Sequence, residues 1–92
     1  MLDVGDVVLS KAGRDKERLF FITEVKDNYI YLVDGDIHKI ENPKLKKVKH
    51  VETTNFHDEI VAHRLINKNK IINQDIKKSL KKFYKNLGGS NV

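Results

Sequence analysis

Apolar and polar positions alternate in short runs through the first half of the chain. Runs rich in β-branched and aromatic residues are separated by glycine, asparagine and aspartate, a pattern typical of short strands joined by turns. These runs predict five strands, at residues 6–10, 18–26, 29–33, 36–40 and 46–52. Short strands at roughly ten-residue spacing indicate a small closed or half-closed antiparallel barrel.

Two dipeptides favour tight turns between these strands. Asp27-Asn28 tolerates turn conformations, and it separates the second and third predicted strands. Asp34-Gly35 is typical of a type I′ hairpin turn, whose central positions need positive φ. It predicts that residues 36–40 return as the fourth strand.

The apolar period changes after Thr54, where two helices are predicted. Thr54 or Asn55 can cap the first, which would run to about Ile66 with acidic residues in its first turn. The second opens at an Asn73 cap and stops at the Gly88-Gly89 pair. Its apolar face would carry Ile76, Leu80, Phe83, Tyr84 and Leu87, and its opposite face Lys77, Lys78, Lys81, Lys82 and Lys85.

The expected fold class is therefore mainly β with C-terminal helices. A chain of 92 residues makes one small domain, with or without an appendage. We expect the small antiparallel β-barrel in residues 1–53, one or two α-helices in residues 54–87, and a flexible tail at residues 88–92.

Composition excludes several classes of protein. There is no cysteine, which rules out disulfides, thiolate chemistry and cysteine zinc sites and fits a reducing compartment. No apolar run approaches the ~20 residues that cross a bilayer, and the N-terminal residues do not have the pattern of a secretory signal. We expect a cytoplasmic protein with no membrane partner.

Positive charge is segregated along the chain. The formal net charge is +5, yet residues 1–37 hold more acidic than basic side chains, so the excess begins at Lys39. A segregated basic zone raises the local concentration of anionic partners. The same composition also describes a lysine-rich solvated surface, and charge alone does not distinguish the two.

No motif of catalysis is present. None of the three serines stands in a strained nucleophile turn, and there is no phosphate-binding or dinucleotide fingerprint. Asp34 and Asp36 resemble a carboxylate pair, but turn chemistry explains them better because they flank Gly35. We predict that the protein is not an enzyme and has no cofactor and no small-molecule substrate.

The candidate metal ligands do not converge. Glu59 and His63 share a face of the first predicted helix, while His57 lies off that face. A zinc site needs three or four convergent ligands. We therefore expect no metal site.

Two basic segments are arranged to meet a polyanion. Arg14, Lys16 and Arg18 border the loop after the first strand. Further along, a lysine run begins in a loop with Lys44 and Lys46 and continues onto the fifth predicted strand. Strand alternation would place Lys47 and Lys49 on the face opposite Val48. Arginine binds phosphate as a bidentate fork and lysine as a point charge.

Other residues leave alternatives open. Tyr29 and Tyr31 share one face of the third predicted strand, where an exposed ring could stack on an unpaired base; core packing is the favoured interpretation because a small chain needs its aromatic residues inside. His50 could contact phosphate or base edges, or stand exposed on its strand. The lysine face of the last helix could bind RNA, an acidic protein or an anionic membrane, or remain solvated.

The stretch from Gly5 to Lys16 resembles a KOW motif, a strand–loop–strand element of ribosomal proteins and transcription elongation factors. Together with residues 33–36 and 43–50, it resembles the large-subunit ribosomal protein family fourteen-e and its small bacterial relatives, described as KOW-domain RNA-binding proteins. The resemblance covers about residues 3–52. It implies an SH3-like barrel of the KOW type, no catalytic activity, and RNA as the ligand.

The resemblance also implies which residues touch RNA. It places RNA contacts on Lys11, Gly13, Arg14 and Lys16 in the loop, and on Lys44, Lys46, Lys47 and Lys49 in the basic run. Arg18 and His50, which flank these segments, complete the set of candidate RNA-binding residues. One departure is Glu17, where such motifs commonly have glycine; its carboxylate would repel phosphate, or pair with Arg14 or Arg18.

Two hypotheses of function follow. In the first, the chain is an RNA-binding protein of the translation machinery that docks on structured RNA, ribosomal RNA in particular, through lysine–phosphate and arginine–phosphate contacts. In the second, it is a protein-interaction module for a ribosomal protein, a polymerase or another transcription or translation factor. Its cations would then steer encounter rather than hold RNA.

Overall fold

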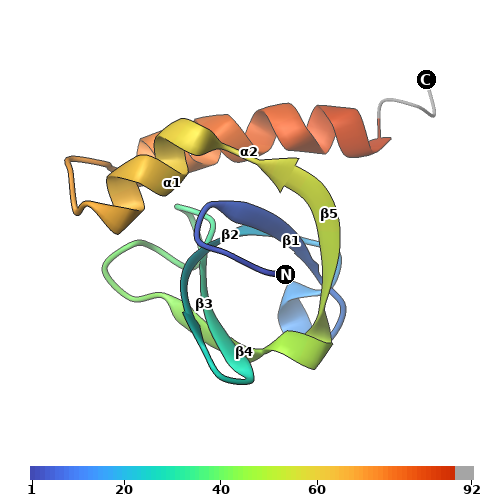
Figure 1. The fold of residues 1–92 in the computed structure, drawn as a ribbon. Helices are drawn as coiled ribbons and strands as arrows, with labels where there is room; N and C mark the ends of the chain where they lie inside the picture. Colours follow the sequence, from blue (N-terminus) through green and yellow to red (C-terminus); the bar gives the residue numbers. More distant parts are fainter. Residues whose placement is uncertain (89–92) are drawn as a thin grey trace.

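Five antiparallel strands, two short 3₁₀ helices and two α-helices form residues 1–88, the part of the chain that the computed structural model describes. Both α-helices lie on the same side of the sheet (Figure 1). The elements are β1 (Asp6–Ser10), η1 (Gly13–Asp15), β2 (Leu19–Lys26), β3 (Tyr29–Val33), β4 (Lys44–Lys47), η2 (Val48–His50), β5 (Val51–His57), α1 (Glu59–Ile66) and α2 (Asn73–Gly88).

The sheet has the strand order β4-β3-β2-β1-β5 and coils strongly on itself (Figure 1). The chain passes from one edge strand, β4, to the other, β5, through η2. In the described residues these two edge strands form no ladder with each other, so the closed barrel is not formed. The sheet stays open at this point because Val48–His50 turn as a 3₁₀ helix instead of continuing as strand.

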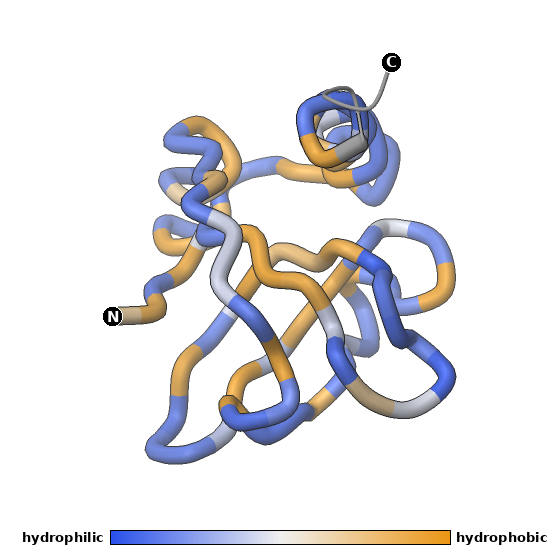
Figure 2. The backbone as a smooth tube through the Cα atoms, turned by 90° about the vertical axis from the view of Figure 1, so that its right-hand side faces the viewer, coloured by the Kyte–Doolittle hydropathy of each residue, from blue (hydrophilic) through white to orange (hydrophobic). Residues whose placement is uncertain are grey.

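Both faces of the sheet are apolar. The face that the coiled sheet encloses buries one cluster, made of Val8, Phe20, Ile22, Ile30, Leu32 and Val51. The outer face packs against the helices in a second cluster, made of Val7, Leu19, Phe21, Val33, Val61, Ile76 and Leu80. Figure 2 shows the helices above apolar strand segments. Each strand in the middle of the sheet therefore needs apolar side chains in both directions.

The predicted fourth strand is wrong, because its residues form a loop between β3 and β4. Residues 36–40 are not a strand, and Asp34-Gly35 does not form a type I′ hairpin. Instead the Asp34 carboxylate accepts hydrogen bonds from the backbone N–H groups of Asp36 and His38, at 3.0 and 2.8 Å. A side chain that binds its own backbone in this way competes with a strand ladder. β3 pairs instead with β4.

The predicted fifth strand is divided by η2, and β5 extends farther than expected, to His57. Thr54 therefore lies in the sheet, where its hydroxyl donates to the Val7 carbonyl at 2.6 Å. The N-cap of α1 is Asp58, not Thr54 or Asn55. Its carboxylate accepts from the N–H groups of Ile60 and Val61, as a helix N-cap does.

Both C-terminal helices are confirmed. In α2, Ile76 and Leu80 are buried against the sheet. Asn73 stands at its start, and its side-chain oxygen accepts from the Ile40 N–H at 2.8 Å, which ties the β3–β4 loop to the helix. The predicted tail lies outside the described residues from residue 89 onward. Within residues 1–88, neither α1 nor α2 is long and apolar enough to cross a membrane.

The absence of a side chain at Gly35 allows α2 to pack closely against the β3–β4 loop. Its φ is +77°, and a Cβ at this position would lie 2.3 Å from the Asn73 carbonyl oxygen. We expect Gly35→Ala to lower the free energy of unfolding by clearly more than the roughly 1–2 kcal/mol that a left-handed backbone costs an L-residue. Urea unfolding checks this.

Gly13→Ala is the matched control for this prediction. The φ of Gly13 is +80°, but the nearest atom to a Cβ there is Lys46 Nζ at 4.0 Å, so only the backbone cost applies. Equal losses in the two variants would contradict the role of Gly35 in helix docking.

Candidate nucleic-acid interface

The loop after β1 is held at both of its ends by backbone hydrogen bonds. Ser10 N–H donates to the Arg18 carbonyl at 3.0 Å, and Glu17 N–H donates to the Ser10 carbonyl at 2.8 Å. Between them η1 begins at Gly13, whose backbone is left-handed. Glu17 also has a positive φ of 69°, so it occupies a position that suits glycine.

This loop is joined to the lysine run by two hydrogen bonds. The Lys11 N–H donates to the His50 carbonyl at 2.9 Å. The Lys46 ammonium donates to the Ala12 carbonyl, also at 2.9 Å. Two segments that are far apart in the sequence thus become one surface with a fixed spacing.

Lys46 makes this junction because of its register. It lies opposite Ile30 in the β3–β4 ladder, so its side chain is on the same face as the enclosed apolar cluster. The half-buried methylene chain covers apolar atoms while the ammonium reaches the loop carbonyl. Lys44, opposite Leu32, is on this face as well.

We call the joined region the basic surface, defined as Lys11, Arg14, Lys16, Lys44, Lys46, Lys47 and Lys49. All of these except Lys46 are exposed. Within residues 1–88, no carboxylate oxygen lies within 4.0 Å of their cationic nitrogens. Their charge is therefore not neutralised by neighbours and is available to an anionic ligand.

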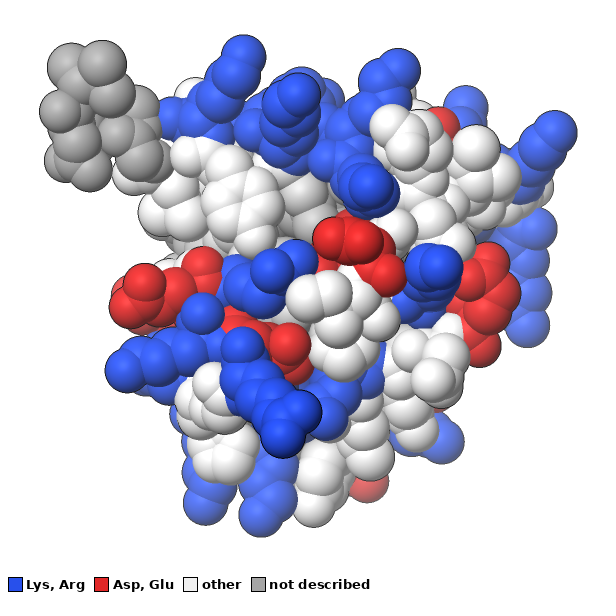
Figure 3. Space-filling view, turned by 180° about the vertical axis from the view of Figure 1, so that it is seen from behind, with Lys and Arg blue, Asp and Glu red and all other residues white. Residues whose placement is uncertain are grey.

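Figure 3 shows Lys and Arg side chains in two gatherings on one side of the molecule. One follows α2, whose five lysines are all exposed. The other lies at the end of the sheet where the β1–β2 loop and η2 are found. The band between them carries Asp, Glu and uncharged side chains with a few Lys or Arg side chains among them. The lysine face of α2 and the basic surface belong to different elements.

Arg18 is set apart from the basic surface. Its guanidinium donates to the carboxylate of Asp34 at 3.1 Å, and Asp34 is only 5% exposed. Asp36 lies 4.0 Å from the same guanidinium. Arg18 thus pairs with these two aspartates, and the expected pairing of Glu17 with Arg14 or Arg18 is not formed in the described residues. Arg18 therefore neutralises the buried carboxylate of Asp34.

The lysine run differs from the predicted strand. Lys44 and Lys46 belong to β4 rather than to a loop, and Lys49 lies in η2 rather than on a strand, so the predicted strand at this place is wrong. Even so, Lys47 and Lys49 line the same hollow. His50 is half-buried. In the described residues its backbone carbonyl, and not its ring, takes part in a hydrogen bond, which the Lys11 N–H donates.

The expectation that both tyrosines pack in the core is not met. Tyr29 is 40% exposed and lines the same hollow, so core packing is the wrong interpretation for it. Tyr31 is half-buried. Phe20 and Phe21 are fully buried, one in the cluster on each face of β2.

The His57 ring in β5 lies between a carboxylate that follows Gly5 in β1 and one at the start of α1. Its Nδ1 lies 2.7 Å from Asp6 Oδ1, and its Nε2 lies 2.8 Å from Glu59 Oε1. His63 points elsewhere and contacts Asn67. Residues 1–88 contain no group of three such side chains that could hold a metal ion. Hydrogen bonds to Asp6 and then Glu59 raise the pKa of His57 above its ordinary value.

No protein-family model matches the chain, and a search of curated proteins finds no match in sequence. The KOW resemblance therefore rests on the residues of this chain alone.

The raised pKa of His57 predicts a pH-dependent stability. Because the folded pKa exceeds the unfolded value of about 6.5, the contribution of protonated His57 is fully present below pH 6.5 and is lost as pH rises through the folded pKa. The free energy of unfolding of His57→Gln should lose this pH dependence. His63→Gln, which removes a histidine without a carboxylate partner in the described residues, should keep it. An unchanged profile in His57→Gln would contradict the assignment.

Replacing Arg18 should lower the free energy of unfolding more than replacing Arg14. Arg18→Ala leaves the buried Asp34 carboxylate without its cation, so we expect the free energy of unfolding to fall by about 1–3 kcal/mol. Arg14→Ala removes an exposed side chain and should change it by less than about 0.5 kcal/mol. Thermal or urea unfolding of both variants checks this, and equal effects would contradict it.

Proposed function

We propose that the protein binds structured RNA through the basic surface. The observation that carries this proposal is the joining of the β1–β2 loop to the β4–η2 segment by the Lys46–Ala12 and Lys11–His50 hydrogen bonds. Cations from two separate segments are then held on one scaffold, as a ribose-phosphate strand requires.

The surface also has a place for close backbone approach. Gly13 is exposed at the start of η1 and lacks a side chain. The atom nearest to a Cβ placed there would be Lys46 Nζ, 4.0 Å away. A phosphate can approach the backbone at such a position more closely than at any other residue. Arg14 and Lys16 are exposed on either side of the buried Asp15.

Binding would come from phosphate contacts rather than base readout. Each lysine–phosphate contact releases a condensed counterion, so affinity falls with salt in proportion to the number of contacts. Paired RNA is recognised mainly through its shape and backbone, and this surface offers only cations and backbone to it. Ribosomal RNA and the translation machinery enter the proposal through the KOW resemblance, and the coiled five-stranded sheet with η2 between its edge strands is compatible with an SH3-like arrangement.

The salt dependence of binding tests the proposal. If the basic surface meets about four phosphates, a log–log plot of the affinity for a hairpin RNA against salt should have a slope of about −3 to −4. The variant Lys44→Ala/Lys47→Ala/Lys49→Ala should weaken binding and make the slope less negative by about 2 to 3. It keeps Lys46, so the junction with Ala12 stays intact. Fluorescence anisotropy at several salt concentrations measures both quantities.

The matched control is Lys78→Ala/Lys81→Ala/Lys85→Ala on α2, which removes the same charge from exposed lysines outside the basic surface. We expect it to keep the slope. A loss confined to this variant would move the site to α2. A protein that is purified without nucleic acid at low salt and binds no hairpin RNA would contradict the proposal and favour the protein-interaction module.

A further inference from the structure

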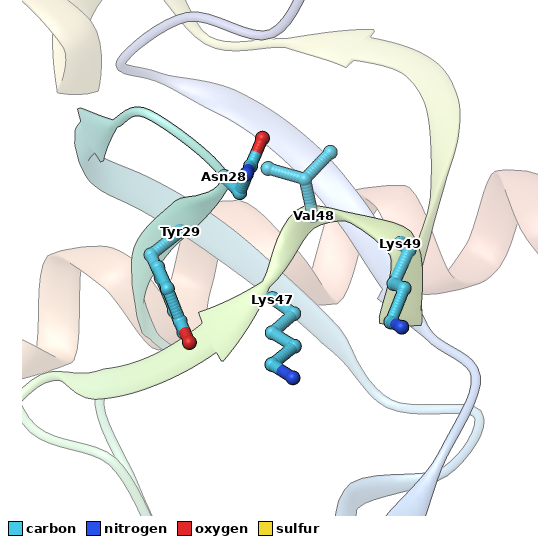
Figure 4. A pocket seen from close by; sticks show the side chains of 5 residues that line it. All are labelled: Asn28, Tyr29, Lys47, Val48 and Lys49. Atoms are coloured by element: carbon cyan, nitrogen blue, oxygen red, sulfur yellow. The ribbon is translucent and has the colours of Figure 1, made fainter.

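A hollow at the β4–η2 end of the basic surface combines an exposed tyrosine with two of its cations. It measures about 420 Å³ and is lined by residues of the β2–β3 turn, β3, β4 and η2. Its lining residues are Asn28, Tyr29, Lys47, Val48 and Lys49. Figure 4 shows the Tyr29, Lys47 and Lys49 side chains extending to the same side, while those of Asn28 and Val48 extend to the other.

The register of the sheet sets Tyr29 beside Lys47. The two residues are partners in the β3–β4 ladder, so their side chains leave the sheet on the same face. This is the outer face, which α1 and α2 cover only farther along β3, at Val33. Tyr29 is therefore 40% exposed although it belongs to a strand that is otherwise mostly buried.

The hollow is held in shape by the backbone. Val48 N–H donates to the Asn28 carbonyl at 2.8 Å, which ties η2 to the β2–β3 turn. The turn itself closes through Asp27, whose φ is +52°. The ring and the two ammonium groups thus come from three elements whose relative positions are fixed before a ligand arrives, and this lowers the ordering cost of binding.

The local charge suits an anion. In residues 1–88, neither Lys47 nor Lys49 has a carboxylate within 4.0 Å. Glu24, which is opposite Tyr31 in the β2–β3 ladder, lies 3.9 Å from the ammonium of Lys26. Asp27 is the acidic residue that remains at the turn. The two positive charges of Lys47 and Lys49 exceed its single negative charge.

We propose that this hollow holds one unpaired nucleotide of the bound RNA, with its base stacked on the Tyr29 ring and its phosphate between the ammonium groups of Lys47 and Lys49. This rests on the proposed function and extends it, since it assigns a single-stranded element to the RNA. A base that is paired within a helix cannot offer its face to a tyrosine, whereas a loop or bulge nucleotide can.

The β4 edge lies between this hollow and the rest of the basic surface. Lys44 and Lys46 are on the enclosed face of β4, and Lys47 is on its outer face. A strand that leaves the β1–β2 loop and crosses this edge would place its next nucleotides at Tyr29. The preferred ligand is therefore a helix that adjoins a short unpaired segment.

Two RNAs and two groups of variants test the proposal. The probes are a hairpin with an unpaired loop and a blunt duplex with the same stem, both read by fluorescence anisotropy. Tyr29→Ala and Tyr29→Leu should bind the hairpin about 5- to 150-fold more weakly, because they remove a stacking face. Neither variant should alter duplex binding or the salt slope, because neither removes a charge. Tyr29→Phe should bind like the wild type.

Leu45→Ala is the matched control, since Leu45 is exposed on the same face but does not line the hollow. It should leave hairpin binding unchanged. Tyr29→Leu keeps an apolar side chain in the ladder, and its melting temperature shows whether a loss of binding is a loss of folding.

A fluorescence measurement gives an independent readout. The chain has no tryptophan, so Tyr29→Trp introduces a single indole in the hollow. The hairpin should quench its emission and the blunt duplex should not. Equal quenching by adenosine monophosphate would assign the hollow to free nucleotides and overturn the proposal.

The outcomes separate this proposal from the proposed function. Wild-type binding with a steep salt slope, together with unchanged hairpin affinity in Tyr29→Ala and Tyr29→Leu, would overturn the nucleotide site alone. Absence of RNA binding by the wild type would overturn both.

Discussion

The sheet has to bury apolar side chains on both of its faces, and this constraint shapes the rest of the molecule. Neighbouring residues such as Val7 and Val8 point in opposite directions and are both buried. One face is covered because the sheet coils on itself, and the other because α1 and α2 pack across it. Coiling brings β4 and η2, at one edge, back to the loop that follows β1. The meeting of the two basic segments is thus a consequence of how the core is closed.

Features with a local signal could be predicted from the sequence. β1, β2, β3 and α2 follow from alternation, helical period and turn residues, all of which are read within a few positions. The β3–β4 loop could not, because an apolar pattern does not reveal that the Asp34 carboxylate will bind the backbone after it. The start of α1 could not either: Thr54 is a good cap in isolation, but its hydroxyl binds Val7 once β5 pairs with β1.

The candidate site, too, could be predicted from the sequence only in part. Sequence locates its cations, since a run of lysines and a loop with Arg14 are visible without a fold. It does not reveal which cations have partners: Arg18 and Arg14 look alike in the chain, yet Arg18 neutralises a buried aspartate. Nor does it reveal that Tyr29 stays exposed, which depends on how far along β3 the helices reach. Glu17 is exposed and has a positive φ, a backbone conformation that glycine adopts more readily than glutamate.

We propose that the β1–β2 loop and the β4–η2 segment bind RNA as one surface. A titration of ¹⁵N-labelled protein with hairpin RNA, followed by NMR, tests it most directly, because each backbone amide reports its own position. We expect the amides of residues 11–16 and 44–50 to shift together and to yield a single affinity. Shifts in one of these segments without the other, or shifts confined to α2, would contradict it.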